Sequence, residues 1–381
     1  MPTKRATVRS SKKVVVQQAK KSKVIGKTVE PNAFALHEAV NNDQIAMVKK
    51  LLEEGPNVDA KDSQGCTPLF NAVLKGKDLI IIRELLKYGA DPMAESKITD
   101  GTILHVACGY MGGKVQVEVV EELLKHGAEI NAKVTNGQTP LFEASIRGKA
   151  TGDGDAIDEE TAESLKVVKL LLKNGANVNA VTNGQGMTAL FCTVQRGILP
   201  VVQELLKNGA NPNIADQHGY TSLHRVCRNL DVALPGIKEG PDSSRMTDIL
   251  ATLVDHGADV NAQDGKGKTP MHHFINDESL LKKYLEKGGK NIDFNIKDKI
   301  GLTALDSTME KGKILFPEAA KNIASNMAKG ALKRAQTKSE SRKDSEHQIF
   351  DQIENLKRAQ EKGNFDPLML LQLFGMQFCH Q

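Results

Sequence analysis

Four features of the sequence have residue types and spacings that could do chemistry. Residues 262–269, Ala-Gln-Asp-Gly-Lys-Gly-Lys-Thr, approach the pattern of a phosphate-binding loop, in which backbone N–H groups and a lysine hold phosphates. The acidic stretch 153–160 is a candidate calcium loop. The chain also contains 10 His and 5 Cys, residue types that bind metals or act in catalysis.

The phosphate-loop and calcium-loop patterns both fail on single positions. Ala262 replaces the first glycine, and Pro270 removes an N–H where a phosphate loop needs a helix N-terminus with free donors. In the acidic stretch, Ile157 stands where an EF-hand needs an oxygen ligand, and Asp158 stands where it needs glycine. We therefore expect a connecting hairpin at the first segment and a solvated acidic loop at the second.

The cysteines and histidines show no catalytic or metal-binding arrangement. The odd, scattered set of cysteines contains no close pair, which predicts neither disulfides nor a zinc site: Cys66, Cys108, Cys192, Cys227 and Cys379. Such free thiols favour a reducing compartment, the cytoplasm or nucleus. No Ser/His/Asp or Cys/His signature is visible. The sequence thus predicts no catalytic residue, no cofactor, no metal and no enzyme activity.

Two phrases recur in phase along the chain. The first is Thr-Pro-Leu-His or a variant, with its third residue at 36, 69, 104, 141, 190, 223, 271 and 305. The second is a pair of apolar residues three positions before a glycine, first at Leu51-Leu52 and Gly55 and last at Leu253-Val254 and Gly257. Thr caps a helix, Pro suits its first turn, the apolar pair anchors a second helix, and Gly ends it in a left-handed turn.

These phrases resemble the ankyrin repeat family, and the resemblance covers residues 32–332. It implies an all-α ankyrin-repeat solenoid of helix–turn–helix units joined by hairpins or turns and capped at both ends. In this family the fourth position of the first phrase is a structural hydrogen-bonding slot, and four histidines occupy it: His37, His105, His224 and His272. Long spacings place insertions at about 149–164 and 229–246, between the two helices of their repeats. Tolerated surface loops and grafted contact surfaces both explain these insertions.

The two ends of the chain differ from the array. Residues 1–31 form a basic arm that we expect to be disordered, since residues 1–29 hold nine Lys or Arg and no acid. The remainder holds 42 basic and 47 acidic side chains, so only the arm favours nucleic acid. A polar linker, 333–346, precedes a helical segment at 347–381. We expect the apolar residues 368–378 of this helical segment to pack either on the last repeat or on a partner. Binding to a membrane surface is a third option.

The resemblance implies protein binding on a concave face made by the hairpins and first helices. A stripe along that face offers Arg and Tyr side chains, which are common interface anchors and suit an acidic partner segment. A merely solvated polar face is the competing interpretation. Our candidate partner-binding residues are Lys75, Tyr110, Arg147, Arg196, Arg225, Arg228 and, in the C-terminal helix, Leu370, Leu371, Phe374 and Phe378.

The predicted function is a non-catalytic protein-interaction adaptor or scaffold. One alternative is a nuclear or chromatin-associated regulator that uses the basic arm, and another is a microbial effector delivered into a host cell. An enzyme with a C-terminal active site would have only His347 and His380 as candidate groups, too few for a catalytic domain. No run of 18 apolar residues is present, so no membrane span is expected.

Overall fold

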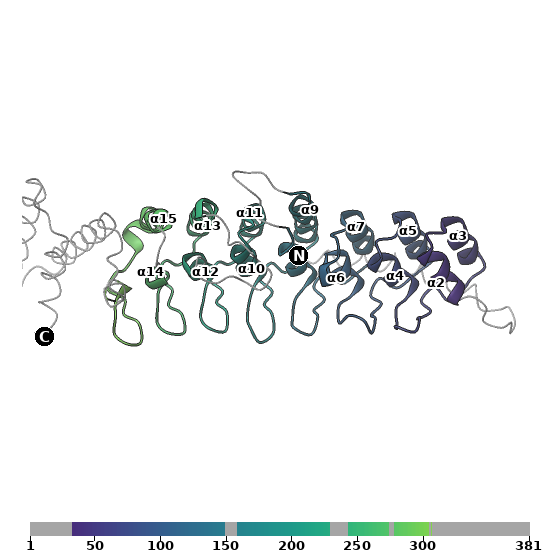
Figure 1. The fold of residues 1–381 in the computed structure, drawn as a ribbon, viewed down its shortest axis with the longest axis horizontal. Helices are drawn as coiled ribbons and strands as arrows, with labels where there is room; N and C mark the ends of the chain where they lie inside the picture. The colour runs from purple at the N-terminus through teal and green to yellow at the C-terminus, as the bar shows by residue number, and fades with distance from the viewer. Residues whose placement is uncertain (1–32, 149–157, 229–242, 274–277, 305, 307–381) are drawn as a thin grey trace, which may run out of the picture.

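The computed structural model describes residues 33–148, 158–228, 243–273, 278–304 and Asp306. Within these ranges the protein is an elongated stack of helix pairs, with no sheet and only two isolated β-bridges. The predicted all-α solenoid is confirmed. Figure 1 shows two parallel rows of helices, with the hairpins projecting beyond the row of first helices.

Each repeat contributes one helix to each row. The first helices are short: α2 (Ala33–Asn41), α4 (Pro68–Leu74), α6 (Ile103–Ala107), α8 (Pro140–Ser145), α10 (Ala189–Arg196), α12 (Ser222–Arg228) and α14 (Pro270–His273). The second helices are α3 (Ile45–Glu53), α5 (Leu79–Lys87), α7 (Val117–Lys125), α9 (Glu159–Lys173), α11 (Leu199–Lys207), α13 (Ser243–Asp255) and α15 (Glu278–Gly288). Two 3-10 turns complete the list, η1 (Tyr110–Gly112) and η2 (Gly289–Asn291).

The sequence phrases form the helix ends as predicted. Thr67, Thr139 and Thr188 each accept a hydrogen bond from the backbone N–H three residues later, at 3.1–3.2 Å. Gly55 and the equivalent glycines after α5, α7, α9, α11 and α13 have φ between 76° and 91°. This is the left-handed region that glycine enters without steric cost, so these positions end the second helices.

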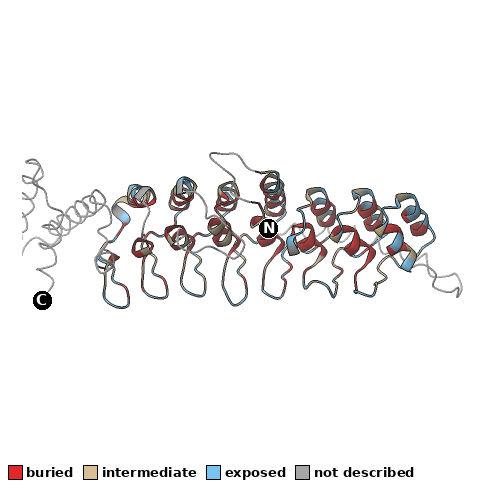
Figure 2. Ribbon diagram, in the orientation of Figure 1, coloured by how far each residue is buried: buried red, intermediate tan, exposed pale blue. Residues whose placement is uncertain are grey.

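The core lies between the two rows and runs the length of the described stack (Figure 2). The leucine of the first phrase is fully or almost fully buried at Leu36, Leu69, Leu104, Leu141, Leu190 and Leu223. Leu51, Leu85, Leu123, Leu171, Leu205 and Leu253 from the second helices face the same core. Because each helix pair has apolar sides facing both neighbours, stacking is what stabilises it.

Helices α9 and α13 are the longest of the described second helices, because parts of the expected insertions are helical. Helix α9 has 15 residues and begins at Glu159, whereas α5, α7 and α11 have nine. Asp158 Oδ1 accepts a hydrogen bond from the Thr161 N–H at 2.7 Å, and the acidic first turn suits the helix dipole. Helix α13 likewise begins at Ser243. Residues 149–157 and 229–242 of the insertions lie outside the described residues.

Candidate functional site

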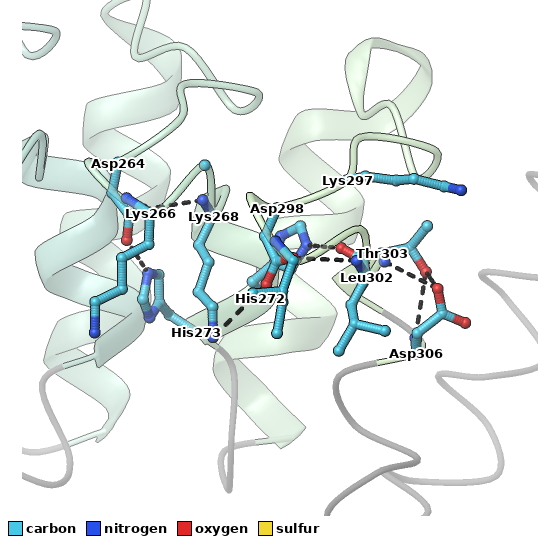
Figure 3. Close-up of polar contacts among 12 residues, drawn as sticks. Asp264, Lys266, Lys268, His272, His273, Lys297, Asp298, Leu302, Thr303 and Asp306 are labelled. Atoms are coloured by element: carbon cyan, nitrogen blue, oxygen red, sulfur yellow. Dashed lines mark hydrogen bonds and ion pairs between the residues drawn. The ribbon is translucent and has the colours of Figure 1, made fainter.

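The four repeat-slot histidines are structural, as predicted. In repeats three, six and seven, the threonine N–H donates to Nδ1 of the slot histidine at 3.1–3.3 Å. Nδ1 is therefore the unprotonated nitrogen, and Nε2 carries the proton and donates to a carbonyl in the next repeat. The bonds are His105 to Gln138 O at 3.2 Å, His224 to Lys268 O at 3.0 Å and His272 to Leu302 O at 3.2 Å. Figure 3 shows the last of these.

The first repeat has the same link, from His37 Nε2 to Ala60 O at 2.8 Å. Repeats two, four and five carry Phe70, Phe142 and Phe191 in this slot, so the histidine link is absent from the three junctions that follow them. Burial lowers the pKa of His105, His224 and His272, which keeps the three rings neutral near pH 7.

Successive hairpins are also joined by their backbones. Gln217 N–H donates to Gln185 O at 2.9 Å and Gly265 N–H to His218 O at 2.6 Å. The same contact joins Lys97 to Gln64, Asn183 to Asn136 and Lys299 to Lys266. The phosphate-loop-like segment is part of this series: its residues form the hairpin before Pro270, with Asp264 N–H bonded to Lys268 O.

His273 forms a buried pair that the sequence analysis did not identify. Its Nε2 lies 2.9 Å from Asp264 Oδ2, and only 1% of the aspartate side chain is exposed (Figure 3). Burial, opposed by the aspartate, lowers the pKa of His273 to about 4. Tyr220 and His224 pack edge-on against this ring, with centroids 5.6 and 5.8 Å away, and Arg228 lies over the Tyr220 ring at 4.9 Å.

A repeated spacing of nine residues could have revealed this pair. Asp62 and Asp264 both use Oδ1 to accept two backbone N–H groups of their own hairpin. Asp62 Oδ2 then accepts a hydrogen bond from Asn71 Nδ2 at 2.8 Å, and Asp264 Oδ2 contacts His273. Both partners stand nine residues after the aspartate, so the hairpin aspartate positions the side chain of the following first helix.

Two of the candidate partner-binding residues are held by internal hydrogen bonds. Lys75 Nζ donates to Asn41 Oδ1 at 2.7 Å. The Tyr110 hydroxyl donates to Asp100, which raises the pKa of Tyr110 to about 12. Asp100 Oδ2 also accepts a hydrogen bond from the Thr135 N–H at 2.9 Å, so Asp100 connects Tyr110 to the next hairpin. The sequence did not reveal this role of Asp100.

The other four described candidates come together at the ends of the first helices, and we call them the arginine cluster: Arg147, Arg196, Arg225 and Arg228. Helix α10 packs against both α8 and α12, which brings these side chains from three successive repeats into one region. Arg147 Nη2 lies 3.5 Å from Glu143 Oε2, an i,i+4 pair whose carboxylate is 4% exposed. Glu143 was also missed by the sequence analysis, although its spacing from Arg147 favours an ion pair.

The cluster is electrostatically unusual for a protein surface. Burial lowers the pKa of Arg196, and the charge of Arg147 lowers it further. Burial lowers the pKa of Arg225 too, and Arg228 adds to the effect. Four N–H-bearing atoms in the cluster are buried and have no hydrogen-bond partner among the described residues: Arg147 Nε, Arg196 Nε, and Arg225 Nε and Nη2.

The remaining candidate residues, the cysteines and any metal site form no further functional group among the described residues. Leu370, Leu371, Phe374 and Phe378 lie outside the described residues, as do His347, His380 and Cys379. Cys66, Cys108, Cys192 and Cys227 are free thiols, and the part of the chain that the structure describes has no cluster of three His, Cys, Asp or Glu suited to a metal. No described helix has the length and apolar character needed to cross a bilayer.

Comparison with known proteins supports the repeat assignment. A family model described as "Ankyrin repeats (3 copies)" matches residues 13–96, 36–134 and 156–234. The fold also matches the crystal structure of the ankyrin repeat domain of Bcl-3, with a TM-score of 0.51 and 24% identity, over 67% of this chain and 99% of that chain.

Curated relatives match over parts of their length. Human "Ankyrin repeat and SOCS box protein 16" is 32% identical over 50% of this chain and 36% of its own length. "E3 ubiquitin-protein ligase KEG" of Arabidopsis thaliana is 25% identical over 73% of this chain and 16% of its own. A "Putative ankyrin repeat protein" of Rickettsia bellii is 35% identical over 23% of this chain and 33% of its own. The chain thus spans about a third or less of these relatives.

Proposed function

Because the chain belongs to the ankyrin repeat family, we propose that it is a non-catalytic adaptor or scaffold that binds protein partners through the ends of its first helices. Ankyrin repeat proteins typically mediate protein–protein interactions. The observation that carries the proposal is the arginine cluster, which gathers four cationic side chains from three repeats. Arginine is enriched at the centres of protein interfaces.

The frame beneath the cluster supports this role. The cluster residues stand on or directly after helices α8, α10 and α12, whose buried sides pack against one another. The hairpin backbones of the same repeats are bonded in series, from Asn136 through Gln185 to His218. A partner therefore meets side chains that three bonded repeats present on one side of the stack.

The four free cysteines of the described ranges, three of them buried, support the second part of the proposal, that the protein works in a reducing compartment, the cytoplasm or the nucleus. The absence of catalytic activity is part of the same proposal. The one buried His–Asp pair that is described, His273 with Asp264, is enclosed by Tyr220, His224 and Arg228, an arrangement that supports a packing role.

Quantitative affinity capture tests the proposal. We would compare the full chain, a chain ending at Glu346, and a variant with Arg147, Arg196 and Arg228 changed to Gln. The matched control changes three exposed lysines in the last turns of second helices to Gln: Lys50, Lys173 and Lys207. It removes the same charge from the opposite row of helices.

We expect a reproducible partner that the control retains and the arginine variant loses. A partner lost only on truncation at Glu346 would move the binding surface to the C-terminal segment. A chain from which neither change removes any captured protein would contradict the adaptor function at both predicted surfaces.

A further inference from the structure

Three members of the arginine cluster stand on successive, packed repeats: Arg147 just after α8, Arg196 at the end of α10 and Arg225 on α12. The charge of Arg147 lowers the pKa of Arg196, and the charges of Arg196 and Arg225 both act on the thiol of Cys192 on α10. Arg147 also packs tightly against the preceding repeat, since a Cβ on Gly109 would lie only 2.9 Å from its Nε. We call these three arginines, one from each of three successive repeats, the strip.

The strip has donors without acceptors. A guanidinium group has five N–H donors and no acceptor. At Arg147, Arg196 and Arg225 the Nε atom is buried and bonded to nothing among the described residues, and at Arg225 the same is true of Nη2. A buried donor without an acceptor destabilises the folded protein. A ligand that supplied an acceptor for these donors would remove part of that cost.

The strip also has few direct ion pairs. Across the described ranges, only Glu143 forms an ion pair with it, at 3.5 Å from Arg147 Nη2. Burial raises the pKa of Glu143 against the opposing effect of Arg147. Arg196 and Arg225 have no ion pair in the described part of the chain, and the carboxylates of Glu160 and Asp216 act on them from beyond ion-pair distance. Cations that are desolvated beside other cations attract an anion more strongly than solvated ones.

We propose that Arg147, Arg196 and Arg225 form a carboxylate-binding site whose occupant is a short acidic segment of a partner protein. The inference rests on the proposed adaptor function and names the chemistry of the partner. Planar carboxylates match the two-pronged geometry of the guanidinium group.

The surroundings favour a short peptide over a long polyanion. Asp100 and Glu143 lie at the Arg147 end of the strip. At the other end Asp216 acts electrostatically on Arg225 itself, and Asp216 and Asp264 both act on the neighbouring Tyr220. Beyond residue 29 the chain holds 47 acidic and 42 basic side chains. A nucleic acid extending past the strip would meet negative charge at both ends, whereas a few carboxylates would not.

Helix geometry sets the spacing of those carboxylates. Packed neighbouring helices lie about 8–10 Å apart. A polyproline II segment rises about 3.1 Å per residue with three residues per turn, so every third side chain returns to the same side after about 9 Å. Acidic residues at every third position therefore match arginines on successive repeats.

The test uses the full chain and two blocked synthetic peptides, three copies of Glu-Pro-Pro and three copies of Gln-Pro-Pro, titrated by calorimetry. We expect the Glu peptide to bind at least tenfold more tightly than the Gln peptide. Arg196→Gln and Arg225→Gln should each weaken the Glu peptide about tenfold, and Lys207→Gln, which removes one charge from the opposite row, should change its affinity less than twofold.

Thermal unfolding supplies a readout that a structural role of these arginines would not give. Because the buried Nε and Nη2 atoms of Arg225 have no acceptor among the described residues, Arg225→Gln should raise the Tm of the free protein while weakening its affinity for the Glu peptide. Arg225→Lys keeps the charge and loses the planar fork, so it should show intermediate affinity. The Glu peptide should raise the Tm of the wild type and leave that of Arg225→Gln almost unchanged.

Several results would overturn the inference. Equal affinity for the Glu and Gln peptides would show that carboxylates are not recognised, as would full affinity in both Arg→Gln variants. Duplex DNA that binds more tightly than the Glu peptide at the same salt, with loss in the Arg→Gln variants, would assign the strip to nucleic acid. Cellular partners lost from the arginine variant without any Glu-peptide binding would leave the adaptor function standing and reject this site.

Discussion

Replacing His273 with Asn is expected to make the array less sensitive to acid. Burial lowers the pKa of His273 from 6.5 to about 4, so its ring stays neutral in the folded protein at pH 5. In the unfolded chain the same ring is protonated at pH 5, because its pKa there is close to 6.5. The unfolded state therefore binds the extra proton, and stability falls as the pH drops below 6.5.

The size of the effect follows from the two pKa values. At pH 5 the unfolded ring is about 1.5 units below its pKa, and each unit is worth about 1.4 kcal/mol, which gives a loss of about 2 kcal/mol. The loss stops growing near pH 4, where the folded ring also takes up a proton. Asp264 does not offset it at pH 5, because its pKa is lowered from 3.8 and it is ionised in both states.

Asparagine is the informative replacement because the chain already uses it at the equivalent position. Asn71 Nδ2 donates to Asp62 Oδ2 at 2.8 Å, as His273 Nε2 contacts Asp264 Oδ2. The variant should keep the hydrogen bond to the hairpin aspartate and lose only the titrating imidazole ring. His105, His224 and His272 also have lowered pKa values, so the variant retains a smaller dependence of the same sign.

Urea unfolding at pH 7.5 and 5.0, followed by far-UV circular dichroism, measures the difference, and NMR titration of the His273 ring measures its pKa directly. The wild type should lose about 2 kcal/mol more than His273→Asn between the two pH values. A ring that titrates near pH 6.5, or two proteins with the same pH dependence, would refute the reasoning.

Two further substitutions and one labelling experiment test the packing. Gly109→Ala should destabilise the protein by about 1–2 kcal/mol or more, because the added Cβ strains the left-handed backbone and contacts Arg147. Gly112 is also left-handed but has open space around it, so Gly112→Ala is the control for backbone strain alone. Equal losses of Tm in the two variants would contradict the contact with Arg147. Tyr284→Phe removes the buried 2.6 Å bond to Val260 O and should cost about 1–3 kcal/mol in urea unfolding, whereas an unchanged midpoint would contradict it. Burial raises the pKa of four thiols, so iodoacetamide at pH 7.5 should modify them only after unfolding, as mass spectrometry would show: Cys66, Cys108, Cys192 and Cys227.

The repeated parts of the fold could be predicted from the sequence because each repeat restates the same local signals. Each signal acts on the backbone within a few residues of its own position, and the helix ends formed by Thr67-Pro68, Leu51-Leu52 and Gly55 are as expected. The helical start of α9 was not predicted. Asp158 caps it locally, but the repeat register placed residues 159–164 in an insertion.

The site was predictable only in part. Counting positions from the repeat phrase placed Arg147 and Arg196 at equivalent helix ends, and these residues do approach one another. How neighbouring repeats stack decides the burial of the Arg225 Nε and Nη2 atoms and the position of Asp100, which binds Tyr110 and the next hairpin. The spacing of residues within one repeat does not contain this information. No described feature tests the predicted roles of Leu370, Leu371, Phe374 and Phe378.

The uneven placement of the histidine links has a mechanical consequence. The links span the first junction, the third, and both junctions around α14, whereas Phe70, Phe142 and Phe191 leave the second, fourth and fifth junctions without them. In a one-dimensional stack, bending and local opening concentrate where neighbouring units are coupled most weakly. The fourth and fifth junctions are adjacent, so we expect the described stack to bend most between α8 and α12. A ligand that contacts all three of the helices α8, α10 and α12 would restrict this bending.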